Sequence, residues 1–220
     1  MKVSIAIDGP AASGKSTIAK IIATKLGFLY IDTGAMYRAF TLGVIEHGLN
    51  PQNEEESNSL IGKIKIGFNE KNHITLDGKD VDERVRENDV ANNVSYIASY
   101  KEIRLHLVDI QRDIAKNTSV VMDGRDIGTY VLPDATLKIF QIADVEERAK
   151  RRYMENLQKG INSTEEDCLE NLKNRDYIDS HRDFAPLKPA EDSIKIDTTS
   201  LKISEVVEKI LSIIKERGIC

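Results

Sequence analysis

Residues 9–16 read Gly9-Pro10-Ala11-Ala12-Ser13-Gly14-Lys15-Ser16, which is the G-x-x-x-x-G-K-[ST] pattern of a phosphate-binding loop. An apolar run at 3–7 precedes the motif and a helical pattern follows it. Glycine lets the backbone turn several N–H groups toward phosphate oxygens, the lysine reaches the β- and γ-phosphates, and the serine hydroxyl ligates Mg²⁺. The alternative is an ordinary glycine-rich bend between a strand and a helix, but the flanking elements favour a nucleoside triphosphate site.

Length and composition limit the classes of protein to which this chain can belong. The chain has 220 residues, of which 40% are hydrophobic and 30% charged, and a formal net charge of −5. This length accommodates one well-buried core plus an insertion. The acidic balance gives no general attraction to nucleic acid or to an anionic membrane. No stretch approaches the ~20 apolar residues that a membrane span requires. Cys168 and Cys220 form no disulfide framework, which favours a reducing cytoplasm, and nothing suggests a partner protein, so a monomer is expected.

Apolar runs alternate with helical patterns along most of the chain, which predicts an α/β fold with a five-stranded parallel sheet flanked by helices. The expected strands cover 3–7, 28–31, 119–122, 137–142 and 194–197. Their carboxyl ends share one edge, where ligands bind in this class. Residues 63–82 instead alternate in the manner of a small antiparallel hairpin, inserted between the second and third strands. Capping boxes at Ser99 with Glu102 and at Ser163 with Glu166 predict two helix starts.

Two polar segments follow expected strands and should reach the edge of the phosphate loop. Thr33 lies near a helix start with Arg38 about one turn later, so the pair could hold a second phosphate; the alternative is an N-cap and a solvated arginine. Asp123-Gly124-Arg125-Asp126 adds a cation and carboxylates, or else forms a polar turn with a surface ion pair. Asp123 could also support Mg²⁺ through water, and the sequence does not separate these roles.

Two further sets of charges share helix faces. Arg148, Arg151 and Arg152 are spaced i, i+3 and i+4, as expected for a lid that lays guanidinium groups on a transferring phosphate, or for a solvated face. A second set, spaced i, i+4 and i+7, consists of Arg175, Asp179 and Arg182. Its alternative interpretation is a self-contained ladder of ion pairs along one helix.

Together these motifs resemble the bacterial cytidylate kinases, a family of P-loop nucleoside monophosphate kinases. The resemblance covers nearly the whole chain, in order. It is carried by Gly9-Pro10 with Gly14-Lys15-Ser16, by Asp32-Thr33-Gly34-Ala35-Met36-Tyr37-Arg38, by Asp123-Gly124-Arg125-Asp126-Ile127-Gly128-Thr129, by Glu147-Arg148-Ala149 with Arg151-Arg152, and by Arg175-Asp176, Asp179, Arg182 and Ala185-Pro186-Leu187. Thr33 stands where many members have serine, and the hydroxyl is retained.

The resemblance implies transfer of the γ-phosphoryl of ATP to CMP or dCMP, with Mg²⁺. It implies one kinase unit over 1–220, with a core at 1–35, 117–147 and 190–220, a nucleoside-monophosphate-binding insertion at 36–116 and a short helical lid at 148–170. The residues implied for ATP are Gly9, Pro10, Ala11, Ala12, Ser13, Gly14, Lys15, Ser16 and Thr17, with Ser16 on the metal. Those implied for the CMP phosphate are Thr33, Arg38, Arg125 and Arg182; for cytosine, Ser95, Arg104 and Asp126; for the sugar, Arg175 and Asp179. Lys15, Arg125, Asp126, Arg148 and Arg152 are the catalytic candidates, with Arg151 a weaker one.

Other functions remain open at this stage. Another small-acceptor kinase, acting on UMP or on a metabolite, fits the phosphate loop as well. A GTP-dependent switch is disfavoured because no Asn/Thr-Lys-x-Asp motif follows a strand. A nucleic-acid-binding role is disfavoured by the acidic charge and the dispersed arginines.

Overall fold

The computed structural model describes residues 2–158 and 160–219, so Cys220 lies outside the described residues. The chain divides into two compact units, Met1–Ile31 with Ala115–Cys220 and Asp32–Ile114. The division into core, insertion and lid that the sequence implies is a finer one and remains a prediction. Within the described ranges no helix is both long and apolar enough to cross a lipid bilayer.

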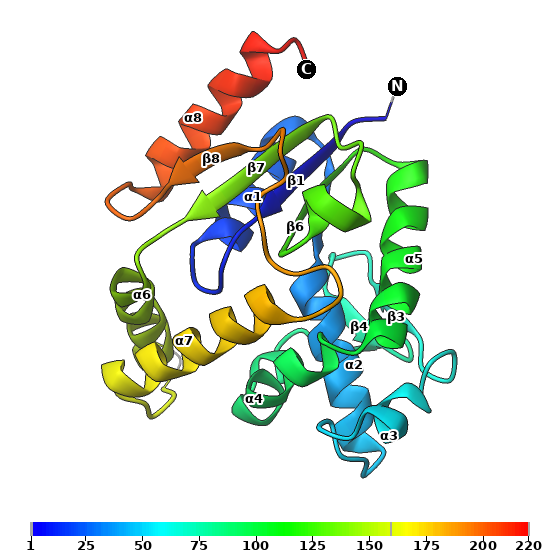
Figure 1. Ribbon diagram of the computed structural model, residues 1–220. Coiled ribbons are helices and arrows are strands. Elements are labelled where there is room, and N and C mark those ends of the chain that lie inside the picture. Colours follow the sequence, from blue (N-terminus) through cyan, green and yellow to red (C-terminus); the bar gives the residue numbers. More distant parts are fainter. Residues whose placement is uncertain (1, 159, 220) are drawn as a thin grey trace. The chain divides into compact units, whose positions relative to one another are not determined.

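The first unit contains a five-stranded sheet in the order β2-β6-β1-β7-β8. Of these strands, Figure 1 labels β6, β1, β7 and β8. Its elements are β1 (Ser4–Asp8), α1 (Lys15–Leu26), β2 (Leu29–Asp32), β6 (Val120–Gly124), the π-helical turn η2 (Ile127–Val131), β7 (Leu137–Ile142), α6 (Val145–Gln158), α7 (Glu165–His181), β8 (Ile194–Asp197) and α8 (Ile203–Glu216). β1 pairs in parallel with both β6 and β7, and β7 pairs in parallel with β8. The parallel α/β sheet expected from the sequence is confirmed.

Aliphatic side chains fix α1 and α8 to one face of this sheet. Ile5 and Ile7 of β1 pack with Ile18 and Ile22 of α1 and with Ile210 of α8, and all five are at most 2% exposed. Burying each such side chain contributes about 1.5–3 kcal/mol to stability. This core positions the carboxyl end of β1, where the phosphate loop begins.

The second unit holds a small antiparallel sheet and helices. Its elements are α2 (Thr33–Glu46), α3 (Glu54–Asn58), β3 (Ile66–Phe68), β4 (Ile74–Leu76), β5 (Lys79–Asp80), the 3₁₀ turn η1 (Arg84–Arg86), α4 (Asn88–Ile97) and most of α5 (Lys101–Asn117). β3 pairs with β4, and β4 with β5, all antiparallel. The expected hairpin is confirmed and has a third, two-residue strand.

Two predicted helix starts are wrong by small shifts. The Ser99 hydroxyl donates to the carbonyl of Tyr96, because the unpredicted helix α4 ends just before it, and α5 begins only at Lys101. The capping box of α7 is formed by Thr164 and Asp167, one residue after the predicted pair, because the threonine hydroxyl reaches the third backbone N–H of the helix.

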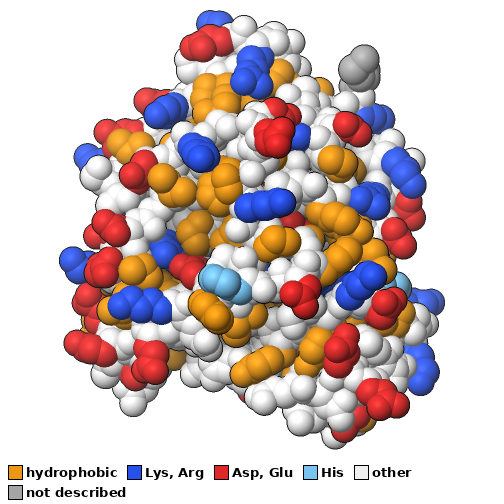
Figure 2. Space-filling view, in the orientation of Figure 1, with side chains coloured by type: hydrophobic (Ala, Val, Ile, Leu, Met, Phe, Trp, Pro, Cys, Tyr) orange, Lys and Arg blue, Asp and Glu red, His pale blue; other side chains and the backbone are white. Residues whose placement is uncertain are grey.

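Figure 2 shows lysine and arginine side chains interspersed with aspartate and glutamate on the face in view. This mixture agrees with the modest net charge of −5. Interspersed charges of both signs are typical of a solvated surface rather than of a stripe that follows a nucleic acid backbone.

We expect Gly9→Ala to destabilise the fold, because a Cβ at residue 9 would lie 2.5 Å from the backbone oxygen of Gln141. Relieving that overlap requires a shift of β7 or of the loop and should cost about 1–3 kcal/mol, measured as a change in the free energy of unfolding in urea. Gly67→Ala is the matched control, since its Cβ would meet only the Thr75 hydroxyl at 3.6 Å. Equal losses in the two variants would contradict the steric argument.

Candidate active site

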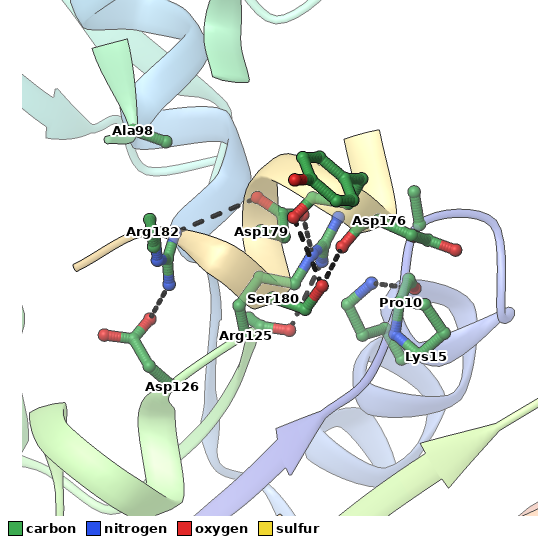
Figure 3. Close-up of polar contacts among 12 residues, drawn as sticks. Pro10, Lys15, Ala98, Arg125, Asp126, Asp176, Asp179, Ser180 and Arg182 are labelled. Atoms are coloured by element: carbon green, nitrogen blue, oxygen red, sulfur yellow. Dashed lines mark hydrogen bonds and ion pairs between the residues drawn. The ribbon is translucent and has the colours of Figure 1, made fainter. Parts of the chain in front are cut away.

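The phosphate-binding motif forms the turn between β1 and α1. Gly14 caps α1 with a left-handed backbone, φ 85°, a conformation that glycine adopts without steric cost. Lys15 is the first residue of the helix and is buried, and its ammonium donates to the Pro10 carbonyl at 3.0 Å (Figure 3). The loop therefore curls around its own lysine, with the N-terminus of α1 directed at the enclosed space, an arrangement suited to binding an anion.

Ser16 and Asp123 lie in contact at the start of α1 and in β6. The Ser16 hydroxyl donates to Asp123 Oδ2 at 2.7 Å, and the Tyr30 hydroxyl donates to Asp123 Oδ1 at 2.8 Å. Asp123 is buried. A hydroxyl beside a carboxylate is a pair of hard oxygen donors of the kind that Mg²⁺ prefers. These residues fit a magnesium ion, and Tyr30 is a partner that the sequence analysis did not single out.

Side chains that could ligate a metal ion do not form a large cluster among the described residues. Within the described ranges, no three His, Cys, Asp or Glu side chains group together in a way that could hold a metal ion. Mg²⁺ in kinases is held by one or two protein oxygens together with phosphate oxygens. The Ser16–Asp123 pair is consistent with that mode of binding.

Ion pairs join α7 to the loop that follows β6 (Figure 3). Arg125 Nε lies 2.7 Å from Asp179 Oδ2, Arg182 lies 3.8 Å from Asp179 Oδ1, and Arg182 also lies 3.4 Å from Asp126 Oδ1. Arg182 follows the end of α7 with an extended backbone, so the expected i, i+7 spacing on one helix face does not apply to it. The ion pairs reach Arg125 and Asp126, which follow β6, so the self-contained ladder along α7 is wrong.

The charges around Asp179 decide its protonation. Burial alone would raise the pKa of its carboxyl, but the neighbouring Arg125, Arg182 and Arg175 together lower that pKa below its ordinary value. For Arg125, burial lowers the pKa, and the negative charges of Asp179, Asp176 and Asp123 raise it above the ordinary value overall. Asp179 is therefore a carboxylate and Arg125 a cation at neutral pH. The ion pairs therefore hold the guanidinium groups of Arg125 and Arg182 in fixed positions.

The three arginines of α6 point to different partners. Arg148 is buried; its guanidinium lies 2.6 Å from Asp176 Oδ2 and donates to the carbonyls of Ala11 and Ala143. Arg151 donates to two backbone carbonyls beyond β8. Arg152 is about one third exposed and pairs with Glu155 at 3.3 Å. The solvated-face interpretation is wrong for Arg148, which links α6 and α7 to the phosphate loop.

In the second unit, the start of α2 gathers a carboxylate and two cations. Asp32 is the N-cap and accepts from the Ala35 N–H at 2.8 Å, while Arg38 lies 3.1 Å and Arg86 4.0 Å from its carboxylate. Thr33 is the first helical residue and is buried, so the alternative in which Thr33 is the N-cap is wrong. Arg86 was not singled out from the sequence.

Ser95 and Arg104 are both buried in the second unit. Ser95 lies on α4. Arg104 lies on α5, donates to the Ala98 carbonyl at 2.9 Å and stacks over the Tyr37 ring at 5.2 Å from its centroid. A guanidinium buried at 1% exposure is costly unless its donors are used. Its place is consistent with recognition of a polar ligand, and its role remains a prediction.

The sequence analysis did not single out Asp8, although it is the last residue of β1 and directly precedes the phosphate loop. Its two carboxylate oxygens accept from the N–H groups of Ile127 and Gly128, each at 2.8 Å. Burial raises the pKa of Asp8 to about 7 despite these two hydrogen bonds, with Asp126 raising it further and Lys15 lowering it. A carboxylate directly after buried aliphatic residues is the signal that could have revealed it.

We expect Asp8 to make the stability of the fold decrease as the pH rises from its ordinary pKa of 3.8 to about 7. Its folded pKa lies above the unfolded value, so its favourable contribution is greatest at low pH and is lost as the pH rises through about 7. The measurement is the free energy of unfolding in urea. Relative to that of Asp8→Asn, the free energy of unfolding of the wild type should be about 2 kcal/mol higher at pH 5 than at pH 8. Asp167→Asn, whose carboxyl pKa is lowered, should show no such change. A constant difference for Asp8→Asn would refute the assignment.

The sequence of this chain matches a known protein family over most of its length. The sequence model of the family described as cytidylate kinase matches residues 5–216. A cytidylate kinase of Bacillus cereus (strain G9842) is 50% identical over 97% of this chain and 96% of its own length. A cytidylate kinase of Halalkalibacterium halodurans is 51% identical over 98% of this chain and 99% of its own.

Solved structures share the fold at low sequence identity. An uncharacterized protein from Eubacterium ventriosum aligns with a TM-score of 0.53 at 16% identity, covering 98% of this chain and 99% of that one. A gluconokinase from Sinorhizobium meliloti aligns with a TM-score of 0.50 at 12% identity, covering 96% and 90%. These two support the architecture alone. The match to the family model and the identity to its members over nearly the whole length show that this chain belongs to the cytidylate kinase family.

Proposed function

We propose that this chain transfers the γ-phosphoryl group of ATP to CMP and dCMP, giving ADP with CDP or dCDP. One observation, in a chain of this family, carries the proposal. β1 and β6 are adjacent parallel strands, and Asp8 at the end of β1 pairs with Gly124 at the end of β6. The phosphate loop and the Arg125–Asp126 turn therefore start side by side at the carboxyl ends of these strands. This adjacency supports the assignment of a triphosphate site and a cationic acceptor site to neighbouring strand ends.

Phosphoryl transfer of this kind needs positioning and charge neutralisation more than covalent participation. We assign the triphosphate to Gly9 through Thr17, whose backbone N–H groups and Lys15 neutralise its charge. Ser16, with Asp123 beside it, would hold Mg²⁺, which supplies further neutralisation of the phosphate oxygens when bound. The transfer is direct and in line, with no phosphoenzyme.

On the acceptor side, we assign the CMP phosphate to guanidinium groups already present in the structure. Arg125 and Arg182 lie on the first unit with Asp179 between them, and Thr33 and Arg38 mark the start of α2. The remaining assignments are Ser95, Arg104 and Asp126 for cytosine and Arg175 with Asp179 for the sugar. Since Asp126 and Asp179 already pair with arginines, a bound nucleotide joins a neutralised network rather than a bare cluster of cations.

Arg148 and Arg152 complete the proposed catalytic set from α6. Arg152 already has a partly exposed guanidinium and can pair with a phosphate at little cost. Arg148 is engaged by Asp176 and by the Ala11 carbonyl, so contact with the transferring group requires it to exchange Asp176 for a phosphate oxygen. Substrate binding therefore has to break a buried ion pair to engage Arg148 but not to engage Arg152.

We expect Lys15→Met to lower kcat by about 100-fold or more, because the methionine keeps the length but removes the positive charge that stabilises the transition state. The measurement is steady-state turnover of ATP with CMP in a coupled assay. Lys20→Met is the matched control, since Lys20 is an exposed lysine on the same helix. Unchanged turnover in Lys15→Met would refute the role given to Lys15.

We expect an acceptor screen with ATP and Mg²⁺ to give the highest kcat/KM with CMP or dCMP among CMP, dCMP, UMP, AMP and shikimate. The recognition groups assigned to cytosine present a fixed set of donors and acceptors, and a mispaired base would leave buried polar groups without partners. Preferred phosphorylation of another acceptor would overturn the proposal. So would slow GTP hydrolysis with no acceptor phosphorylated.

A further inference from the structure

Asp8 links the two halves of the proposed catalytic apparatus within the first unit. It ends β1 and is followed at once by Gly9, the first residue of the phosphate loop. Its carboxylate accepts two hydrogen bonds of 2.8 Å from the consecutive N–H groups of Ile127 and Gly128. Those residues come directly after the Arg125–Asp126 turn. The segment that carries the acceptor-side arginine is therefore fastened to the first residue before the loop.

The residues of this link are closely packed, so that small shifts would break its contacts. Ile127 and Gly128 open the π-helical turn η2, and N–H groups at the start of a helix have no intrahelical partner. Asp8 supplies that partner from another strand. A Cβ at Gly128 would lie 3.4 Å from Asp8 Oδ2 and 3.2 Å from the Lys138 side chain. Only a residue without a side chain fits there without pushing a neighbour aside.

The chemistry of the link requires two acceptor oxygens on the side chain of residue 8. Asp8 is only 5% exposed, so a backbone N–H group left without an acceptor there would be costly. An asparagine of the same shape has one acceptor oxygen and one NH₂ group, so it can satisfy only one of the two N–H donors. Both donors are satisfied only when both side-chain oxygens accept.

We propose that Asp8 is a positioning residue for phosphoryl transfer, which holds the Arg125–Asp126 turn in register with the phosphate loop. This inference rests on the proposed function. Arg125 in turn pairs with Asp179, and Asp126 with Arg182. A shift of the turn therefore moves the guanidinium groups of the acceptor site relative to Lys15. Misplacement of about 1 Å is enough to cost up to 100-fold in rate.

The test compares Asp8→Asn with the wild type and with Asp192→Asn. Asp192 pairs with Lys138 on the same sheet at 2.8 Å and lies outside the proposed site, so its variant controls for the loss of an ion pair. For Asp8→Asn we expect kcat to fall by about 10- to 100-fold, while the dissociation constant of ADP, measured by calorimetry, stays within about twofold. Asp192→Asn should keep the wild-type kcat.

Two results would overturn the proposal. One is a folded Asp8→Asn enzyme whose kcat lies within twofold of the wild type. The other is a parallel loss of kcat and of ADP affinity, which would mean that Asp8 supports only the phosphate loop. If Asp8→Asn fails to fold, Gly128→Ala perturbs the same link from the opposite side and should show the same split between kcat and ADP affinity.

Coupling to Arg125 gives a second, independent measure. If Asp8 acts through the Arg125–Asp126 turn, the double variant Asp8→Asn/Arg125→Lys should lose less activity than the product of the two single losses. Asp8→Asn combined with Arg152→Lys should lose the full product, because Arg152 lies on α6 and pairs with Glu155. Independent effects of Asp8 and Arg125 would contradict the proposal.

A readout that needs no turnover separates this inference from the proposed function. In the wild type, the amide hydrogens of Ile127 and Gly128 should exchange slowly, and Asp8→Asn should accelerate their exchange at least tenfold. If the wild type fails to phosphorylate CMP, the proposed function fails and the kcat comparison moves to the acceptor that the screen identifies. Unchanged exchange of both amides in Asp8→Asn would overturn the link itself.

Discussion

The site depends on one electrostatic arrangement, in which buried carboxylates hold guanidinium groups that are buried or nearly so. Asp179 lies between Arg125 and Arg182, and Arg182 also faces Asp126. Neither sign of charge could be buried alone without a large loss of solvation. Pairing them makes it possible to keep cations in a fixed place in the absence of an anionic ligand. The carboxylates thus stabilise the positions of the arginines to which we assign the phosphate of CMP.

Backbone packing provides the matching constraint at the phosphate loop. Gly9 approaches the backbone of Gln141 so closely that no Cβ fits, and Asp8 ties the end of the same strand to the turn after β6. Both contacts arise from adjacent parallel strands, and both fall at their carboxyl ends. The parallel sheet is therefore more than a scaffold, because its register decides which loops meet.

The sequence was sufficient for the parts that rest on local pattern. The phosphate loop, the five strands and the inserted antiparallel hairpin follow from motif spacing and from the periodicity of apolar residues. Helix α4 was not predicted, and the starts of α5 and α7 were displaced by a residue or two, because several polar residues there can cap equally well. The contacts of Asp8, Tyr30 and Arg148 could not be predicted, since each joins segments about 90 or more positions apart, and only the strand order brings them together.

The hydrogen bond from Arg148 to the Ala11 carbonyl has a mechanical consequence. Arg148 belongs to α6, forms an ion pair with Asp176 of α7, and donates a hydrogen bond to Ala11 in the phosphate loop. A rotation of α6 and α7 as a pair would carry this donor with it and leave a loop carbonyl in need of another. The loop's shape is therefore tied to the position of a helical hairpin that begins more than 130 residues later, so that displacing one strains the other.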